Sequence, residues 1–344
     1  MLKAILRYGI PLIVSIGLCY LLFTGVDFGE MMEIIRSECS FGWIGLALVI
    51  SIFSHIFRAM RWRIQLRALG IDAPLFYLVL SIFGTYAVNL VFPRLGEVWR
   101  TGYIAQRQKA PFTEVFGSMV ADRLSDTITV FLLTAVTFLV ASKSLLSYLA
   151  QNPDLYNNIM STFTSPWLWT AVGALVIGIW LVFTRMSSNA AVIKIKNLWH
   201  GLWAGFAVIA KMKGKGKWLL LTVAVWGCYF VQLYVAFFAF DFTTQIIERY
   251  GIIAPLVCFV FSSLSMAVPS NGGIGPWQWA VIFGLGLYSA GIVLPEGIGF
   301  KEMATSFANL VMGCQTLLLI VLGIFTFICI SIDRHRHSAL PAKK

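Results

Sequence analysis

Charged residues are scarce in this chain. Only 12% of its 344 residues are Asp, Glu, Lys or Arg, whereas about 25% are charged in an average soluble domain. Hydrophobic residues make up 59% of the chain, and its mean hydropathy is +0.82. This composition excludes a water-soluble enzyme or binding module, because too few polar residues are available to cover its surface. We predict an all-α polytopic membrane protein with a single integral membrane domain over residues 1–344.

Acidic residues are rarer than basic ones. The chain has 15 Asp and Glu against 26 Lys and Arg, a net charge of +11. A nucleic-acid-binding surface needs a solvated basic face, which this composition does not supply. We therefore expect no nucleic-acid partner and attribute the charge to membrane topology and to attraction toward anionic lipids.

Recognisable catalytic and metal-binding patterns are missing from the sequence. The six cysteines are scattered, mostly in apolar runs, which excludes a paired-cysteine zinc site and a disulfide framework. No Ser/His/Asp set, Walker loop or dinucleotide fingerprint occurs. We expect no enzymatic activity, no catalytic residues, no metal site and no cofactor.

Nine apolar runs alternate with short polar segments. They occupy residues 8–24, 41–59, 75–92, 115–141, 167–184, 218–240, 252–269, 277–294 and 303–330. The first follows Lys3 and Arg7 as a signal peptide would, but no small-x-small cleavage site follows it, so we expect an uncleaved first span.

The distribution of Lys and Arg indicates how these runs cross the membrane. If every run crossed once, the cations of segments 100–109 and 185–217 would lie outside, against the positive-inside rule. Both segments become cytoplasmic if the run 75–92 turns back at 93–96. The same argument makes 252–294 a hairpin that enters from outside and turns at 269–276. Both termini are then predicted to be cytoplasmic.

This topology is an inverted repeat, in which each half is span, span, broken hairpin, span. The halves cover about 8–141 and 167–330. Residues 189–210 suit a helix lying in the cytoplasmic interface, or equally a short cytosolic helix packed on the bundle. Residues 331–344 are expected to form a basic, disordered tail. Paired breaks at matching places in two halves are typical of a transporter binding site.

Ionisable residues at and after the first break could form one network, because charges at membrane depth usually pair. They are Arg94, Glu97, Arg100, Asp122, Arg123 and Asp126. We expect Arg94 or Arg100 to pair with Asp126, and Arg123 with Glu97. The network would be either a cationic cleft that takes an anionic head group or an ion-pair cluster that only fixes the hairpin.

The second break is rich in glycine and carries no charge. Its candidate ligand-binding residues are Asn271, Gly272, Gly273, Gly275 and Gln278. Ser270 or Asn271 could cap a helix whose first position is Pro276, and Trp277 and Gln278 would lie in its first turn. Free N–H groups there would bind a phosphate, unless the segment is a packing turn only.

Two further features carry polar side chains beside the second run. We interpret His55 as a hydrogen-bonded core residue rather than a proton relay. The cluster of Arg58, Arg61, Arg63 and Arg67 is interpreted as a topology signal that binds the lipid surface.

Three motifs in order resemble the transmembrane family of lysylphosphatidylglycerol synthase, the flippase-like membrane domain of multiple peptide resistance factor. They are Arg94-Leu95-Gly96-Glu97, Asp122-Arg123-Leu124-Ser125-Asp126 and Pro269-Ser270-Asn271-Gly272-Gly273-Ile274-Gly275. The resemblance implies movement of lipids or lipid-linked precursors between leaflets. It points to Arg94, Glu97, Arg123, Asp126, Gly272, Gly273 and Gly275.

Two departures from this family bear on function. Trp277-Gln278 stands where the family often has an Arg-Glu pair, which affects the head-group preference. The soluble aminoacyl-transferase domain is absent from these 344 residues, so we expect the chain not to synthesise the aminoacylated lipid.

Our leading hypothesis is a lipid flippase in a bacterial-type inner membrane, with anionic lipids or a polyprenyl-phosphate-linked substrate as partners. A membrane-embedded enzyme on lipid phosphates, using Glu97, Asp122 or Asp126 as acid or base, is one alternative. A non-transporting assembly factor is the other. Whether the chain forms a homodimer is left open.

Overall fold

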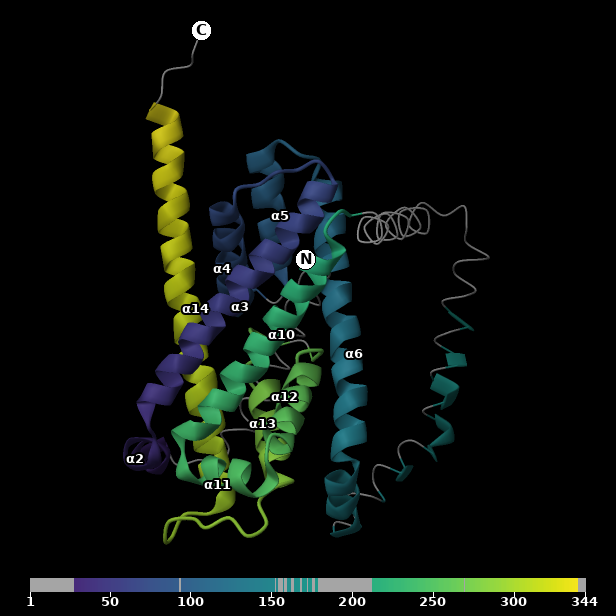
Figure 1. Ribbon diagram of the computed structural model, residues 1–344, viewed down its shortest axis with the longest axis vertical. Coiled ribbons are helices and arrows are strands. Elements are labelled where there is room, and N and C mark those ends of the chain that lie inside the picture. Colours follow the sequence, from purple (N-terminus) through teal and green to yellow (C-terminus); the bar gives the residue numbers. More distant parts are fainter. Residues whose placement is uncertain are drawn as a thin grey trace.

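The computed structural model describes residues 28–92, 94–151, 212–268 and 270–339, together with scattered residues between 153 and 178. Within these ranges the regular secondary structure is helical, as predicted, and contains no strand. Figure 1 shows the helices as an elongated bundle in which α14 (Phe300–Ala339) runs along one side.

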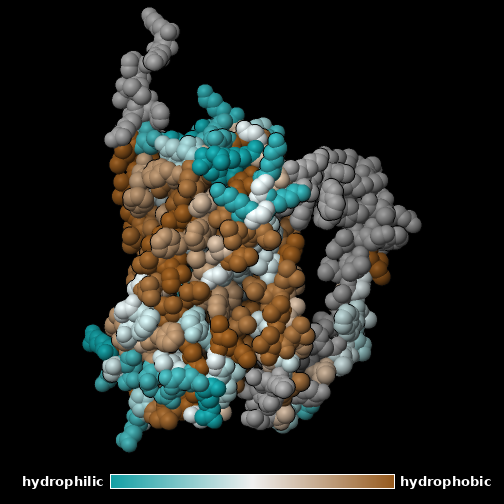
Figure 2. Space-filling model, viewed as in Figure 1, coloured by the Kyte–Doolittle hydropathy of each residue, from teal (hydrophilic) through white to brown (hydrophobic). Residues whose placement is uncertain are grey.

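Four helices are long and apolar enough to cross a bilayer, which needs about 20 residues per span. They are α3 (Phe41–Ala68), α6 (Phe112–Gln151), α10 (Lys215–Ala236) with its extension η1 (Phe237–Ala239), and α14. Figure 2 shows a broad hydrophobic belt between two hydrophilic ends. Large apolar side chains such as Phe131 and Leu139 of α6 are 67% and 75% exposed. The protein is therefore an integral membrane protein whose belt faces lipid.

The first break forms a hairpin between α4 (Leu75–Val91) and α5 (Leu95–Gln108). These helices have 17 and 14 residues, so they are about 25 and 21 Å long. Each helix is therefore shorter than a hydrocarbon core of about 30 Å is thick. Arg94 has a left-handed backbone at the turn, with φ 62°.

The second break forms a matching hairpin between α12 (Ile253–Ser265) and α13 (Pro276–Gly286). Gly272, Gly273 and Gly275 in its turn have φ angles of 64°, 89° and 94°, a region that other residues adopt at a cost. In Figure 1 this hairpin lies toward the opposite end of the bundle from α4 and α5.

The inverted repeat itself stays a prediction. The run 8–24 and the proposed interfacial helix 189–210 lie outside the described residues, and only scattered residues of the run 167–184 lie within them. No boundary between the two halves is therefore defined by the structure.

Three details differ from the sequence prediction. Two helices occur where no apolar run was predicted, α2 (Phe28–Glu38) and α11 (Asp241–Tyr250), and both lie at the lower end of the bundle in Figure 1. The helix begun in the run 277–294 ends at Gly286. Helix α14 continues to Ala339, because residues 331–340 contain no Gly or Pro, so most of the predicted disordered tail is helical.

Two apolar cores hold the hairpins in place. One gathers Phe237, Phe240, Phe242 and Phe307 around α10, α11 and α14, where their rings meet edge to face. The other joins the last part of α3 to α4, α5 and the start of α6. The candidate site lies beside this second core.

Candidate functional site

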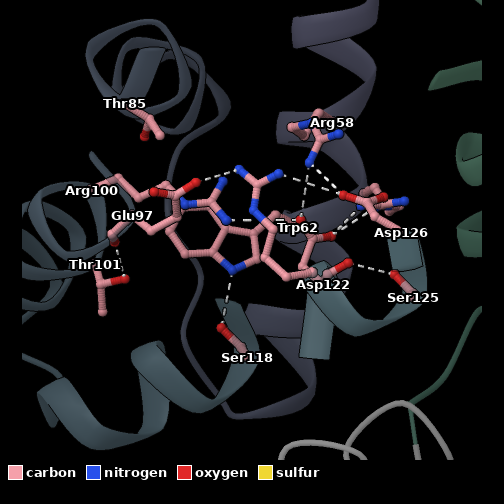
Figure 3. A network of polar contacts seen from close by, with 12 residues as sticks. Arg58, Trp62, Thr85, Glu97, Arg100, Thr101, Ser118, Asp122, Ser125 and Asp126 are labelled. Carbon is pink, nitrogen blue, oxygen red and sulfur yellow. Dashed lines mark hydrogen bonds and ion pairs between the residues drawn. The ribbon is translucent and has the colours of Figure 1, made fainter. Parts of the chain in front are cut away.

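Charged side chains from α3, α5 and α6 meet inside the bundle (Figure 3). We call the following set the arginine network. Its members are Arg58, Arg61, Glu97, Arg100, Asp122, Arg123 and Asp126.

The centre of the network is formed by two arginines of α3 and two carboxylates of α6. Arg58 Nη1 lies 2.7 Å from Asp126 Oδ2, and Arg61 Nη2 lies 2.7 Å from Asp122 Oδ1 and 2.8 Å from Asp126 Oδ1. Arg61 and Asp122 are fully buried. The interpretation of Arg58 and Arg61 as surface residues is therefore wrong, because α3 continues as a helix and turns both side chains toward α6.

Of the other arginines of that cluster, Arg67 is exposed and Arg63 is half-buried. Arg67 Nε donates to Asp72 Oδ1 at 2.8 Å, and Arg63 Nη2 approaches the same oxygen at 3.2 Å. The hydrogen bond from Arg67 lowers the pKa of Asp72, which is exposed in the loop between α3 and α4.

The predicted pair between Arg123 and Glu97 is present. Arg123 Nη2 lies 3.0 Å from Glu97 Oε1, so the pair joins α6 to the first hairpin. Asn89 fixes the same place from α4: its amide nitrogen donates to Glu97 at 3.3 Å, and its oxygen accepts from the Gly96 N–H at 2.8 Å. Glu97 is thereby held at the turn.

Arg100 differs from the other arginines of the network. Its nearest carboxylate oxygen is Asp122 Oδ2, at 3.8 Å, so the expected pair with Asp126 does not form. The guanidinium lies 4.6 Å over the Trp62 ring, whose Nε1 donates to Ser118 at 3.0 Å. Arg100 is fully buried, and its guanidinium donates no hydrogen bond to any described residue.

Arg94 lies outside the network. It is exposed, and its Nη2 donates to the Ala267 carbonyl of the other hairpin at 3.3 Å. A Cβ added to Gly272 would stand 2.6 Å from Leu90 Cδ2. The turns of the two hairpins are therefore in contact, as the transporter hypothesis requires.

The second turn begins α13 as predicted at Pro276, with Trp277 and Gln278 in the first helical turn. The residue before the helix is Gly275, so neither Ser270 nor Asn271 caps it. The Gly275 N–H donates to Gln278 Oε1 at 2.7 Å, and the Trp277 N–H donates to the Gly273 carbonyl at 3.1 Å. These groups are occupied, so fewer N–H groups face a ligand here than we expected.

Two further side chains of this turn, Gln278 and Asn271, differ in their hydrogen bonds. Gln278 Nε2 donates to Asn309 of α14 at 3.4 Å. The side-chain oxygen of Asn271 is buried and accepts no hydrogen bond from the described part of the chain.

The sequence contained a signal for the missed members of the site. Arg58 and Arg61 are three residues apart, and Gln65 follows four residues later, so all three lie on one face of α3. All three are buried. The Tyr229 hydroxyl of α10 accepts a hydrogen bond from Arg58 Nε at 3.3 Å. The same hydroxyl lies 3.4 Å from the Tyr86 hydroxyl of α4. These contacts join segments that are far apart in the chain, and no sequence pattern predicts them.

The chemistry of the network favours binding an anion over acid or base catalysis. Each of its three carboxylates lies within ion-pair distance of an arginine. No group of His, Cys, Asp and Glu among the described residues could hold a metal ion.

Comparison with known proteins identifies the family of the chain. A curated relative, "Glycosyltransferase AglD" of Haloferax volcanii, is 29% identical over 106 residues, which are 30% of this chain and 17% of the relative. No solved structure matches the chain. The family model described as "Lysylphosphatidylglycerol synthase TM region" matches residues 9–323, nearly the whole chain. The chain therefore belongs to this family, and its function is related to membrane lipids.

Proposed function

We propose that this protein moves an anionic lipid, either a phospholipid or a lipid-linked precursor, between the leaflets of the membrane. The head group binds in the arginine network, beside the turns of the two hairpins. The observation that carries the proposal is Arg100, a fully buried guanidinium that donates no hydrogen bond to a described residue.

A buried charge without hydrogen bonds is costly, so a protein retains one where a ligand completes it. Four arginines of the network face three carboxylates, which leaves one excess positive charge. A phosphodiester head group carries one negative charge. Binding it would neutralise the network and supply the oxygen atoms that Arg100 lacks.

The surroundings of the network suit a lipid with its acyl chains in the bilayer. A groove with an apolar lining runs between α3 and α10, and Phe57 and Cys228 lie in it. Their sequence neighbours are Arg58 and Tyr229, which hydrogen-bond each other inside the bundle. The head group would then be inside while a chain lies along the groove, and rocking of the two halves would expose the site to either leaflet.

The test is lipid movement in liposomes that contain the purified protein. Labelled phosphatidylglycerol, phosphatidylcholine and polyprenyl phosphate are each followed by a quencher added outside. We expect faster movement of the anionic lipids, reduced about tenfold or more by Arg100→Gln, because the lost interaction is a charge-assisted hydrogen bond.

The matched control is Arg67→Gln, which makes the same substitution on α3 at an arginine that is exposed and pairs with the exposed Asp72. Its rate should equal that of the unchanged protein. Equal rates for both variants, or no movement of any lipid under any ion gradient, would refute the proposal. A new lipid product that disappears with Glu97→Gln would instead support an enzyme. Neither movement nor product would favour an assembly factor.

A further inference from the structure

Polar side chains continue beyond the arginine network into the middle of the bundle. Ser51, Ser54 and His55 precede Arg58 on the buried face of α3. Ser51 accepts a hydrogen bond from Gln315 of α14 at 2.8 Å, and Gln315 accepts one from Gln232 of α10 at 3.0 Å. Buried polar groups at this depth are expensive and usually line the route of a polar ligand or ion.

His55 stands out along this face. It is 2% exposed, and neither of its ring nitrogens makes a hydrogen bond with a described residue. The ring centroid lies 4.7 Å from that of Tyr86, with the two rings tilted by 41°, and the ring meets Phe83 edge to face at 6.0 Å. We expected a hydrogen-bonded core histidine, and among the described residues that expectation is wrong. Two buried ring nitrogens without hydrogen bonds need an explanation.

The charged and titratable groups around His55 come from several helices. Arg58 lies one turn further along α3, where residues three apart are neighbours. Tyr86 of α4 contacts the ring, Tyr229 of α10 hydrogen-bonds Arg58, and Asp126 of α6 pairs with Arg58. From α14, the uncharged Gln315 hydrogen-bonds Ser51 on the same face of α3. Without a bound anion, the arginine network carries an excess positive charge, which disfavours a further cation beside it. His55 is therefore neutral when no anion is bound.

We propose that His55 binds a proton when a head group with two negative charges, a phosphate monoester, enters the arginine network. This inference rests on the proposed function and names phosphate monoesters as the substrate class for which His55 matters. A phosphodiester, with one negative charge, balances the four arginines and three carboxylates without a further proton. A monoester needs a second positive charge, and the buried imidazole supplies it.

The proton balance is simple. Water at the membrane surface gives the proton to an imidazole nitrogen when the monoester enters, and the imidazolium returns it to water when the monoester leaves. A monoester would therefore move with one proton, and a phosphodiester with none.

Proton uptake can be counted by calorimetry of lipid binding in two buffers that differ in ionisation enthalpy. The protein is held in phosphatidylcholine nanodiscs at about pH 8, where a phosphate monoester is already doubly charged since its second pKa is about 6. Short-chain phosphatidic acid is the monoester probe, and short-chain phosphatidylglycerol is the diester control.

We expect about one proton to be taken up per phosphatidic acid bound, and none with phosphatidylglycerol. His55→Gln and His55→Phe should abolish the uptake and weaken phosphatidic acid binding about tenfold, while phosphatidylglycerol binding stays unchanged. The phenylalanine variant preserves the ring packing on Tyr86 and Phe83, which guards against a folding defect.

Uptake that persists in both variants, or binding of phosphatidic acid without uptake, would overturn the role of His55 and leave the proposed function intact. Failure of both lipids to bind the unchanged protein would count against the proposed function itself.

Discussion

Arg61 and Arg100 are both fully buried beside Asp122, yet the structure gives them different roles. Arg61 Nη2 lies within 2.8 Å of both Asp122 and Asp126. Arg61→Gln leaves those carboxylates with less compensation, and breaking a buried pair costs about 3–5 kcal/mol. We expect a clearly lower melting temperature in detergent, measured by tryptophan fluorescence.

Arg100→Gln should behave in the opposite way. Its ion pair is long, and its guanidinium makes no hydrogen bond with the described residues, so removing the charge relieves desolvation. The lost contact with Trp62 offsets this by about 0.5–2 kcal/mol. We expect an unchanged or higher melting temperature together with slower lipid movement. A variant that is as unstable as Arg61→Gln would make Arg100 a structural residue.

Sequence reasoning at this scale found pairs that lie next to the break and missed those that cross the bundle. The pair of Arg123 and Glu97 is predicted correctly because Glu97 lies at the turn of the first hairpin and Arg123 lies on the helix that follows it. Asp126 was assigned to Arg94 or Arg100, whereas its closest partners are Arg58 and Arg61. A run of arginines after an apolar segment is typical of a topology signal, and only the packing of α3 on α6 distinguishes the two buried ones.

At the scale of elements, the first hairpin depends on a glycine at its turn. A Cβ on Gly96 would stand 2.8 Å from Asn89 Oδ1 and even closer to the Thr85 carbonyl oxygen. Gly96→Ala must therefore push α5 away from α4, and overpacking of this kind costs about 1–3 kcal/mol. We expect a lower melting temperature and weaker lipid movement, because Glu97 and Arg100 move with α5.

Gly102 of the same helix is the matched control, since nothing lies within 4 Å of a Cβ added there. Gly102→Ala should stabilise α5 by up to about 1 kcal/mol through helix propensity. If both alanine variants changed the melting temperature equally, close packing at Gly96 would not be what holds the hairpin.

The hairpins themselves were predictable, whereas the helices at the lower end were not. Pro and Gly inside apolar runs, together with the positive-inside rule, placed both turns correctly. Helices α2 and α11 are short and carry polar residues, so a search for apolar runs passes over them. Glycine content also suggested free N–H groups at α13, but Gln278 and the Gly273 carbonyl already bind two of them.

At the scale of the whole molecule, the two hairpins enter from opposite ends and touch through Arg94, Ala267, Leu90 and Gly272. Composition alone predicted the membrane class, since it depends on the total of apolar residues rather than on their contacts. The contact between the turns depends on side chains from both halves, and the sequence could only place those turns at corresponding positions.

Orientation in the bilayer is the prediction that joins these scales, because it decides which leaflet the arginine network opens toward. Lys109 follows the first hairpin, Lys213 precedes α10, and Lys301 lies at the start of α14, all three exposed. The positive-inside rule places Lys109 and Lys213 in the cytoplasm and Lys301 outside. In a variant without its six natural cysteines, single cysteines at these positions are treated with an impermeant maleimide in intact cells and in inverted vesicles. We expect Lys301→Cys to react in cells, and Lys109→Cys and Lys213→Cys to react in inverted vesicles. Labelling of Lys109→Cys and Lys213→Cys from different sides would contradict the topology, since α4 and α5 could then not return to the side from which they entered.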